Sequence, residues 1–183
     1  CTLPVHGGAI RVLDRVDCAV CEPRWSPDGK RLAYSARTDS SAVAQIQLLS
    51  LETLGREALT MPTPESVVDF LPAFAPDGQE VAFIRMNDVG QQDVFLARVD
   101  GSGSRALAFG QDHIAGVDWI SPDEIVLSAS PMASYELWRV SLESGKRALL
   151  PIGGGAAICP SVACGGRLMV YGEMLYDCDI WCL

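Results

Sequence analysis

Long apolar runs are missing from this sequence of 183 residues. None approaches the roughly 20 consecutive apolar residues of a membrane-spanning helix, so no membrane span is expected in this segment. Basic residues are also scarce: 14 lysines and arginines stand against 23 aspartates and glutamates, and the resulting net charge of −9 argues against nucleic-acid contact by this segment. Hydrophobic residues still make up 49% of the chain, enough to bury the core of one soluble globular domain.

Helical periodicity is missing too, because an apolar period of 3.6 residues nowhere persists for twelve residues. The apolar stretches are four to seven residues long, rich in valine, isoleucine, leucine and aromatic residues, and separated by turns. The sequence therefore predicts an all-β protein that is nearly free of helix.

One turn sequence recurs, and an apolar triplet follows it each time. The turns are Trp25-Ser26-Pro27-Asp28-Gly29, Phe74-Ala75-Pro76-Asp77-Gly78, Trp119-Ile120-Ser121-Pro122-Asp123 and, faintly, Val162-Ala163-Cys164-Gly165-Gly166. The triplets are Leu32-Ala33-Tyr34, Val81-Ala82-Phe83, Ile125-Val126-Leu127 and Met169-Val170-Tyr171, and their last residues lie 49, 44 and 44 positions apart. After each triplet a further strand is expected, at Gln45 to Leu49, Asp93 to Ala97, Glu136 to Val140 and Asp179 to Leu183. A fourth strand is expected to close the first three units, at Arg56 to Thr60, Arg105 to Ala108 and Arg147 to Leu150.

The Pro-Asp-Gly turn has a mechanical basis. Proline presets φ, aspartate accepts local backbone N–H bonds, and glycine takes the positive φ that joins two antiparallel strands. The third unit lacks this glycine, and the fourth replaces the motif with Cys164-Gly165-Gly166. Those two turns are expected to be tighter or differently shaped.

Four antiparallel strands that recur every 43 to 49 residues favour a β-propeller, because sheets stacked around an axis bury both faces and leave short edges. The chain holds about four blades' worth of sequence, which fits a partial larger propeller or a four-bladed ring. The expected units are 1–16 (the end of a blade), 17–60, 61–108, 109–150 and 151–183 (an incomplete blade). A β-sandwich is the competing arrangement, but it would not require the same turn, triplet and strand to recur in one order.

The repeat resembles the TolB-type propeller repeat, which is WD40-like and of the PD40 type, and whose hallmark is Ser-Pro-Asp-Gly followed by Leu-Ala-Tyr or Val-Ala-Phe. The resemblance covers nearly the whole chain and is most specific at Glu22 to Tyr34 and Leu71 to Phe83. The layout is also similar to propellers fused to bacterial winged-helix regulators or to protein kinases. In those proteins the propeller would be a sensory or interaction module.

Both ends are expected to cut a unit. Leu3 to Gly8 is typical of a strand end with its turn, and Ala9 to Val16 of an outermost strand from an earlier blade. That strand either belongs to a larger propeller or completes the last sheet of a four-bladed ring. A first residue of Cys1 indicates a processed chain or a fragment, and a lipid-anchored amino terminus is a further alternative.

Candidate site residues are few. No Gly-x-Ser-x-Gly elbow occurs, so a serine hydrolase is poorly supported and no catalytic residue is assigned. Asp17, Asp69 and Asp112 are expected to precede successive innermost strands and to converge with His113 on one rim of the propeller, where they would suit a cation or a basic peptide. Ordinary loop solubility is the alternative role for these four residues.

Cys18-Ala19-Val20-Cys21 has the spacing of a redox or zinc knuckle, but its possible partners Cys159, Cys164, Cys178 and Cys182 have other spacings. Neither a metal nor a cofactor is therefore expected. Gly101 to Ser104 is predicted as a hairpin turn, and the arginines at 56, 105 and 147 as charges that protect outer edges. The four tryptophans, Trp25, Trp119, Trp138 and Trp181, are predicted to pack within blades.

These observations predict a non-catalytic, TolB-like propeller that binds a protein or peptide partner through the loops entering the innermost strands. It would be part of a larger protein such as a bacterial transcriptional regulator or kinase. The alternatives are the gating propeller of a prolyl-oligopeptidase-type serine hydrolase and a periplasmic TolB-like envelope component. The compartment, periplasmic or cytoplasmic in a bacterium, stays open.

Overall fold

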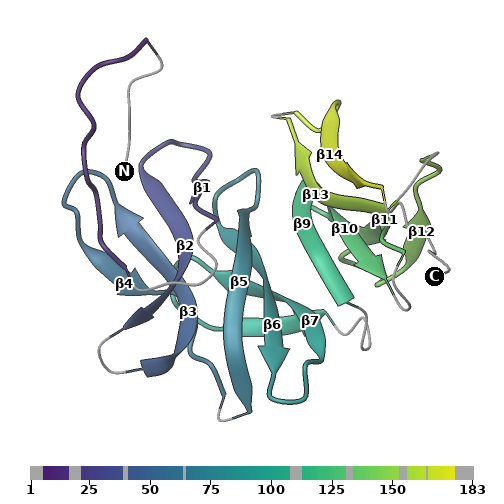
Figure 1. Cartoon of the computed structure of the whole chain (residues 1–183), viewed down its shortest axis with the longest axis horizontal. Helices are drawn as coiled ribbons and strands as arrows, with labels where there is room; N and C mark the ends of the chain where they lie inside the picture. Colours follow the sequence, from purple (N-terminus) through teal and green to yellow (C-terminus); the bar gives the residue numbers. More distant parts are fainter. Residues whose placement is uncertain are drawn as a thin grey trace, which may run out of the picture.

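The computed structural model describes residues 6–16, 22–38, 41–63, 65–107, 113–130, 134–152, 156–163 and 165–175, and every regular element within them is a β-strand (Figure 1). The prediction of an all-β chain is confirmed. Nothing helical within these ranges has the length and apolar character needed to cross a membrane.

The strands form four antiparallel units, here called blades 1 to 4 in chain order, of which blades 1 and 2 are joined into one eight-stranded sheet. In the first three blades each strand pairs with its neighbour in the chain, as expected from the repeat. Blade 1 holds β1 (Arg24–Trp25), β2 (Arg31–Thr38), β3 (Ser41–Ser50) and β4 (Arg56–Ala58). Blade 2 holds β5 (Ser66–Phe74), β6 (Glu80–Asn87), β7 (Gln92–Arg98) and β8 (Ser104–Leu107). Blade 3 holds β9 (His113–Ser121), β10 (Glu124–Ser130), β11 (Glu136–Ser141) and β12 (Arg147–Leu149), and blade 4 holds β13 (Ala156–Val162) and β14 (Met169–Met174).

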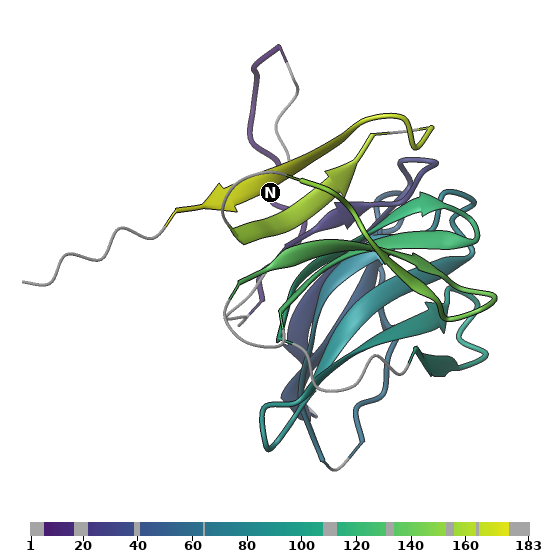
Figure 2. The same cartoon turned by 90° about the vertical axis from the view of Figure 1, so that its right-hand side faces the viewer.

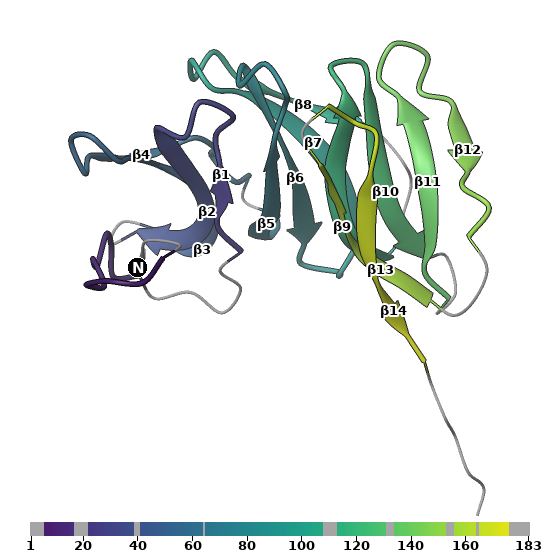
Figure 3. The same cartoon turned by 90° about the horizontal axis from the view of Figure 1, so that it is seen from above.

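The blades lie side by side with their first strands innermost (Figure 3). Figure 2 shows the β13–β14 hairpin of blade 4 as the outermost layer of this stack. Neighbouring blades contact mainly through side chains, although one parallel pairing, Ala44 with Val68, joins β3 to β5. This is the radial arrangement of a propeller, and the described residues do not form the two facing layers of a β-sandwich.

The core lies between blades, because both faces of each central strand are covered. Val81, Ala82 and Phe83 on β6 are all fully buried, as are Val126 and its two neighbours on β10. This explains why the triplets lack the alternation of apolar and polar residues that a strand with one solvated face would show. One apolar cluster joins blade 1 to blade 2, and another joins blade 2 to blade 3.

The turns after the innermost strands share one geometry in blades 1, 2 and 4. Gly29, Gly78 and Gly166 take φ of 70°, 71° and 68°, and each N–H donates to the carbonyl three residues earlier, at 2.8 to 3.0 Å. The prediction of a different shape is therefore wrong for the described part of the fourth turn, because glycine supplies the required positive φ without the proline. It is confirmed for blade 3, where β9 and β10 are separated only by Pro122 and Asp123.

Hydrogen bonds between blades recur at equivalent places. Ser35 Oγ on β2 donates to the Asp69 carbonyl at 2.6 Å, and Ser128 Oγ on β10 donates to the Ala157 carbonyl at 2.7 Å. Both serines directly follow an apolar triplet. Because these bonds are buried, they fix how far each blade slides along the next.

The expected strand at Ala9 to Val16 is not formed. Within residues 6–16 only Arg11 makes an isolated bridge, while Leu13 and Val16 pack on the outer face of blade 1. In a flat strand Leu13 and Val16, three positions apart, would point to opposite faces. Their shared contact with blade 1 therefore excludes a flat strand here. Among the described residues β14 pairs with β13 and with no amino-terminal segment, so the four-bladed closure is not formed there.

Innermost strands approach each other closely at Gly116 on β9. A Cβ atom built there would lie 2.6 Å from Cδ of Pro160 and 3.0 Å from Cα of Cys159, both on β13. Cys159 has a positive φ of 50° and lies where the register of β13 shifts. The bulge in β13 and the bare backbone of Gly116 therefore fit against each other.

We expect Gly116→Ala to lower the free energy of unfolding by about 1 to 3 kcal/mol, because the added methyl group overpacks the junction of blades 3 and 4. Urea unfolding measures the loss. Gly55→Ala is the matched control, since its Cβ would meet only the Thr53 side chain, at 3.1 Å. Equal losses in the two variants would contradict the close packing at Gly116.

Candidate functional site

Asp69 lies inside β5, and not before it as the sequence analysis expected. The strand begins earlier because Ser66 already pairs with Asn87 of β6. The Asp69 side chain is 0% exposed. Its Oδ1 accepts a hydrogen bond from Arg85 Nε at 2.7 Å, and its Oδ2 accepts one from Arg85 Nη2 at 2.8 Å. This is a buried, bidentate ion pair across adjacent strands of blade 2.

Thr60 connects this ion pair to blade 1. Its hydroxyl donates to Asp69 Oδ2 at 2.6 Å and accepts the N–H of Ile46 on β3 at 3.0 Å. The Arg85 guanidinium also lies over the Phe95 ring, 4.8 Å from its centre. Asp69 is thus engaged inside the protein, at the junction of blades 1 and 2.

The other predicted rim residues are only partly placed. His113 opens β9 with an exposed side chain. Asp17 and Asp112 lie outside the described residues, as do most of the loops that enter the innermost strands. The convergence of these residues on one rim therefore stays a prediction.

A groove of about 570 Å³ lies at the opposite rim, where the turns after the innermost strands meet. All four blades contribute to it, so it opens at the end of the propeller axis. Its lining comprises Arg24, Trp25, Ser26, Pro27, Ala73, Phe74, Pro76, Asp118, Trp119, Ile120, Ser121, Pro122, Val162, Ala163, Gly165 and Gly166. The recurrence of one turn in four units is the signal that could have predicted it, because equivalent ends of blades share a rim.

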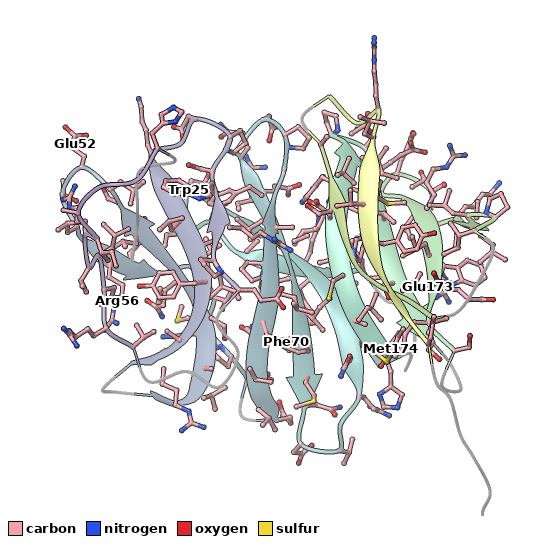
Figure 4. All side chains as sticks on the ribbon, turned by 45° about the horizontal axis from the view of Figure 1, so that its top comes forward. Trp25, Glu52, Arg56, Phe70, Glu173 and Met174 are labelled. Carbon is pink, nitrogen blue, oxygen red and sulfur yellow. The ribbon has the colours of Figure 1, made fainter. Side chains whose placement is uncertain are left out.

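Trp25 is the most exposed aromatic residue of this groove, with 54% of its surface accessible. The prediction that it packs within a blade is wrong, because β1 is only two residues long and ends at the rim. Figure 4 shows Trp25 near the turn end of the sheets, whereas Phe70 lies farther along β5. Trp119 is buried as predicted, with 4% of its surface exposed, but it packs between blades: its Nε1 donates to the Ala73 carbonyl of blade 2 at 3.0 Å.

Asp118 carries a half-buried carboxylate in the groove wall. Its Oδ1 accepts the N–H of Trp119 at 2.9 Å, and its Oδ2 accepts the N–H of Val162 at 2.7 Å, which links blade 3 to blade 4. Burial raises the pKa of Asp118 above its ordinary value of 3.8, while these two bonds and the charge of Arg24 lower it by less. Arg24 itself lies 3.9 Å from a carboxylate oxygen of Glu22.

A second hollow of about 330 Å³ adjoins the groove, and the two share Ser26, Pro27 and Phe74. It lies between the turns of blades 1 and 2 and contains three exposed carboxylates. The remaining lining residues are Asp28, Arg31, Asp77, Gly78, Gln79, Val99 and Asp100. The rim thus combines an apolar groove with an acidic neighbour.

Among the cysteines, Cys159 is described, and its thiol is exposed. Partial burial raises the pKa of this thiol, and the nearby charge of Glu22 raises it further, so the site does not favour a thiolate. The Cys18 to Cys21 pair, Cys164, Cys178, Cys182 and Trp181 lie outside the described residues. Within the part of the chain that the structure describes, no three histidine, cysteine, aspartate or glutamate side chains gather as a metal site.

No family model matches the chain. Dipeptidyl-peptidase 5 of Porphyromonas gingivalis is 29% identical over 137 residues, which cover 67% of this chain and 19% of that protein. This chain therefore spans about a fifth of the length of that relative.

Solved TolB structures share the fold. The putative TolB from Agrobacterium tumefaciens superposes with a TM-score of 0.69 at 20% identity, covering 82% of this chain and 53% of that one. TolB from Acinetobacter baumannii gives 0.68 at 18% identity over 81% and 36% of the two chains. Dipeptidyl peptidase 4 of P. gingivalis gives 0.55 at 14% identity over 75% and 26%. The chain has the fold of a TolB-like β-propeller, which confirms the resemblance stated from the repeat.

We expect Asp69→Ala to lower the free energy of unfolding by about 3 to 5 kcal/mol, because it leaves the buried guanidinium of Arg85 without its partner. The matched control is Arg105→Ala, which breaks a partly exposed pair with Glu80 at 3.9 Å and should cost at most about 1 kcal/mol. Denaturant unfolding compares them. Similar small losses in both variants would contradict a structural role for Asp69.

The raised pKa of Asp118 predicts a pH-dependent stability difference. The folded chain holds this proton more tightly than the unfolded chain, so the stability it contributes is present below pH 3.8 and is lost as the pH rises through the folded pKa. Asp118→Asn cannot ionise. The stability of this variant relative to wild type should therefore increase between about pH 3 and pH 6, as measured by unfolding across that range. A constant difference would contradict the burial effect.

Proposed function

We propose that this chain is a non-catalytic, TolB-like propeller module that binds a protein or peptide partner. The partner would occupy the groove of about 570 Å³ at the rim where the turns after the innermost strands meet. The main observation in support is that residues at the turn ends of all four blades line one groove, in which Trp25 is exposed. A volume of about 570 Å³ lies within the usual range of ligand sites, roughly 300 to 1,000 Å³. Exposed tryptophans at such places commonly act as anchors for a partner.

The surrounding structure supports binding at this groove. The polar groups of the wall are held by other parts of the protein: Asp118 accepts two backbone N–H bonds, and the indole N–H of Trp119 is bonded to β5. A wall fixed in this way loses little conformational entropy when a partner binds. The opposite rim, with Asp17, Asp112 and His113, remains a second predicted binding surface, but Asp69 is buried in its ion pair and does not belong to it.

The wider protein is also a proposal. The chain spans between 19% and 53% of the proteins to which it is similar, so other parts of a longer polypeptide could carry a separate activity. A sensory module of a bacterial transcriptional regulator or kinase fits the repeat, and a TolB-like envelope component fits the same fold. In either case the propeller would supply binding, and the reaction would occur elsewhere.

The second candidate function is the gating propeller of a prolyl-oligopeptidase-type hydrolase. The similarity to dipeptidyl-peptidase 5 and the superposition on dipeptidyl peptidase 4 favour it. A Gly-x-Ser-x-Gly elbow on an α/β domain of the same polypeptide would select this candidate. Hydrolysis of a dipeptidyl substrate by the longer polypeptide would favour this candidate over the regulator and the envelope component, and would leave the binding role of the propeller itself unchanged.

Peptide selection tests the groove. A phage library of random twelve-residue peptides is selected on the wild-type chain, and the enriched peptides are synthesised for affinity measurements. We expect Trp25→Ala to weaken their binding at least tenfold, because the variant removes the exposed aromatic wall.

The control is Val89→Ala, which removes another exposed apolar side chain from the β6–β7 turn at the other end of blade 2. It should leave affinity unchanged. Enriched peptides that bind Trp25→Ala as tightly as wild type would overturn the proposed site.

A further inference from the structure

The acidic hollow adjoins the apolar groove through shared residues, so a single extended ligand can occupy both. Ser26, Pro27 and Phe74 line both spaces. In an extended peptide each residue advances the chain by about 3.3 Å. A side chain in the groove and another in the hollow therefore belong to positions only a few residues apart.

The three carboxylates of the hollow are held in place by their own turns. Asp28 Oδ1 accepts the Ser26 hydroxyl at 2.6 Å and the Lys30 N–H at 3.0 Å. Asp77 Oδ1 accepts the Gln79 N–H, and Asp100 Oδ1 accepts the Ser102 N–H, both at 2.9 Å. Each bond uses Oδ1, so Oδ2 of Asp28 and of Asp77 accepts nothing from the rest of the described chain.

Hydrogen bonds stabilise the charged form of Asp28 and of Asp100. The hydrogen bond from the Ser26 side chain, followed by that from the Lys30 N–H, lowers the pKa of Asp28. Bonds from Ser102 do the same for Asp100, with a smaller contribution from Arg98. The hollow thus presents fixed negative charge without needing a change of conformation.

The charge of the lining favours a cationic ligand. The lining holds three carboxylates and one guanidinium, that of Arg31, and Lys30 lies in the same turn without lining the hollow. Arg98, also outside the lining, pairs with Asp100 at 3.6 Å, so the charge open to a ligand is mainly that of Asp28 and Asp77. The chain as a whole carries −9. An acidic peptide would be repelled both at long range and at contact, whereas a lysine or arginine side chain would meet partners at the open Oδ2 atoms.

We propose that the groove and the hollow together bind a peptide segment in which a large apolar side chain, packed on Trp25, is followed or preceded within a few residues by lysine or arginine. This inference rests on the proposed function, because it names the ligand class of the same site. The apolar groove supplies most of the affinity. The hollow selects the charge and sets the direction of the peptide.

Three synthetic peptides test the inference on the wild-type chain. Each has a central Leu-Trp pair in a Gly-Ser sequence, and the two positions after that pair are two lysines, two glutamines or two glutamates. A second set carries the same residues before the pair. We expect the better of the two lysine peptides to bind at least tenfold more tightly than its glutamate counterpart at low salt, and this preference to shrink at 0.5 M salt.

Asparagine variants test which carboxylates produce the preference for the lysine peptide. The double variant Asp28→Asn and Asp77→Asn keeps the Oδ1 acceptors of both turns and removes both charges, so the lysine peptide should bind it no more tightly than the glutamine peptide. The control is Asp88→Asn with Glu65→Gln, which removes two exposed charges at the opposite end of blade 2. It should keep most of the preference for lysine.

The outcomes separate the two proposals. Binding that depends on Trp25 but shows no charge preference overturns this inference and leaves the proposed function standing. An equal loss of preference in the control variant also overturns it, because the effect then comes from net charge alone. If binding of every peptide is insensitive to Trp25→Ala, the proposed function fails, and the inference fails with it.

Discussion

Covering both faces of every central strand is the constraint on which this structure depends. The fully buried side chains of β6 and β10, such as Phe83 and Val126, point alternately to the two sides of their sheets. An isolated four-stranded sheet would leave both sets in water. Each blade is therefore completed by its neighbours, and the chain folds as a radial stack in which stability belongs to the contacts between units.

Apolar contact alone would let neighbouring blades slide, and buried polar groups prevent this. Ser35 and Ser128 each bind a carbonyl of the next blade, and the ion pair of Asp69 with Arg85 is tied to blade 1 through Thr60. A buried donor or acceptor that loses its partner costs more free energy than the bond itself contributes. The blades thus have one low-energy alignment, and their turns meet in a defined way at the rim.

The alignment of the blades determines which side chains are exposed at the rim that carries the groove. Trp25 stays exposed because the strand that carries it is short, while Trp119, two repeat units further along the chain and on a longer strand, is buried against β5. The same turn that joins two strands also fixes a carboxylate beside its proline, as at Asp28 and Asp77. An apolar groove flanked by charge therefore follows from repeating one structural turn around an axis.

The amino-acid sequence by itself determined the strands, their order and most of their turns, because apolar triplets and positive-φ glycines act over a few residues. It did not reveal that Asp69 is buried in an ion pair, that Trp25 is exposed, or that residues 9–16 form no strand. Those outcomes depend on which residues from distant units come together. Only the tertiary structure decides such contacts, since burial and pairing are properties of the assembled blades and not of any local pattern.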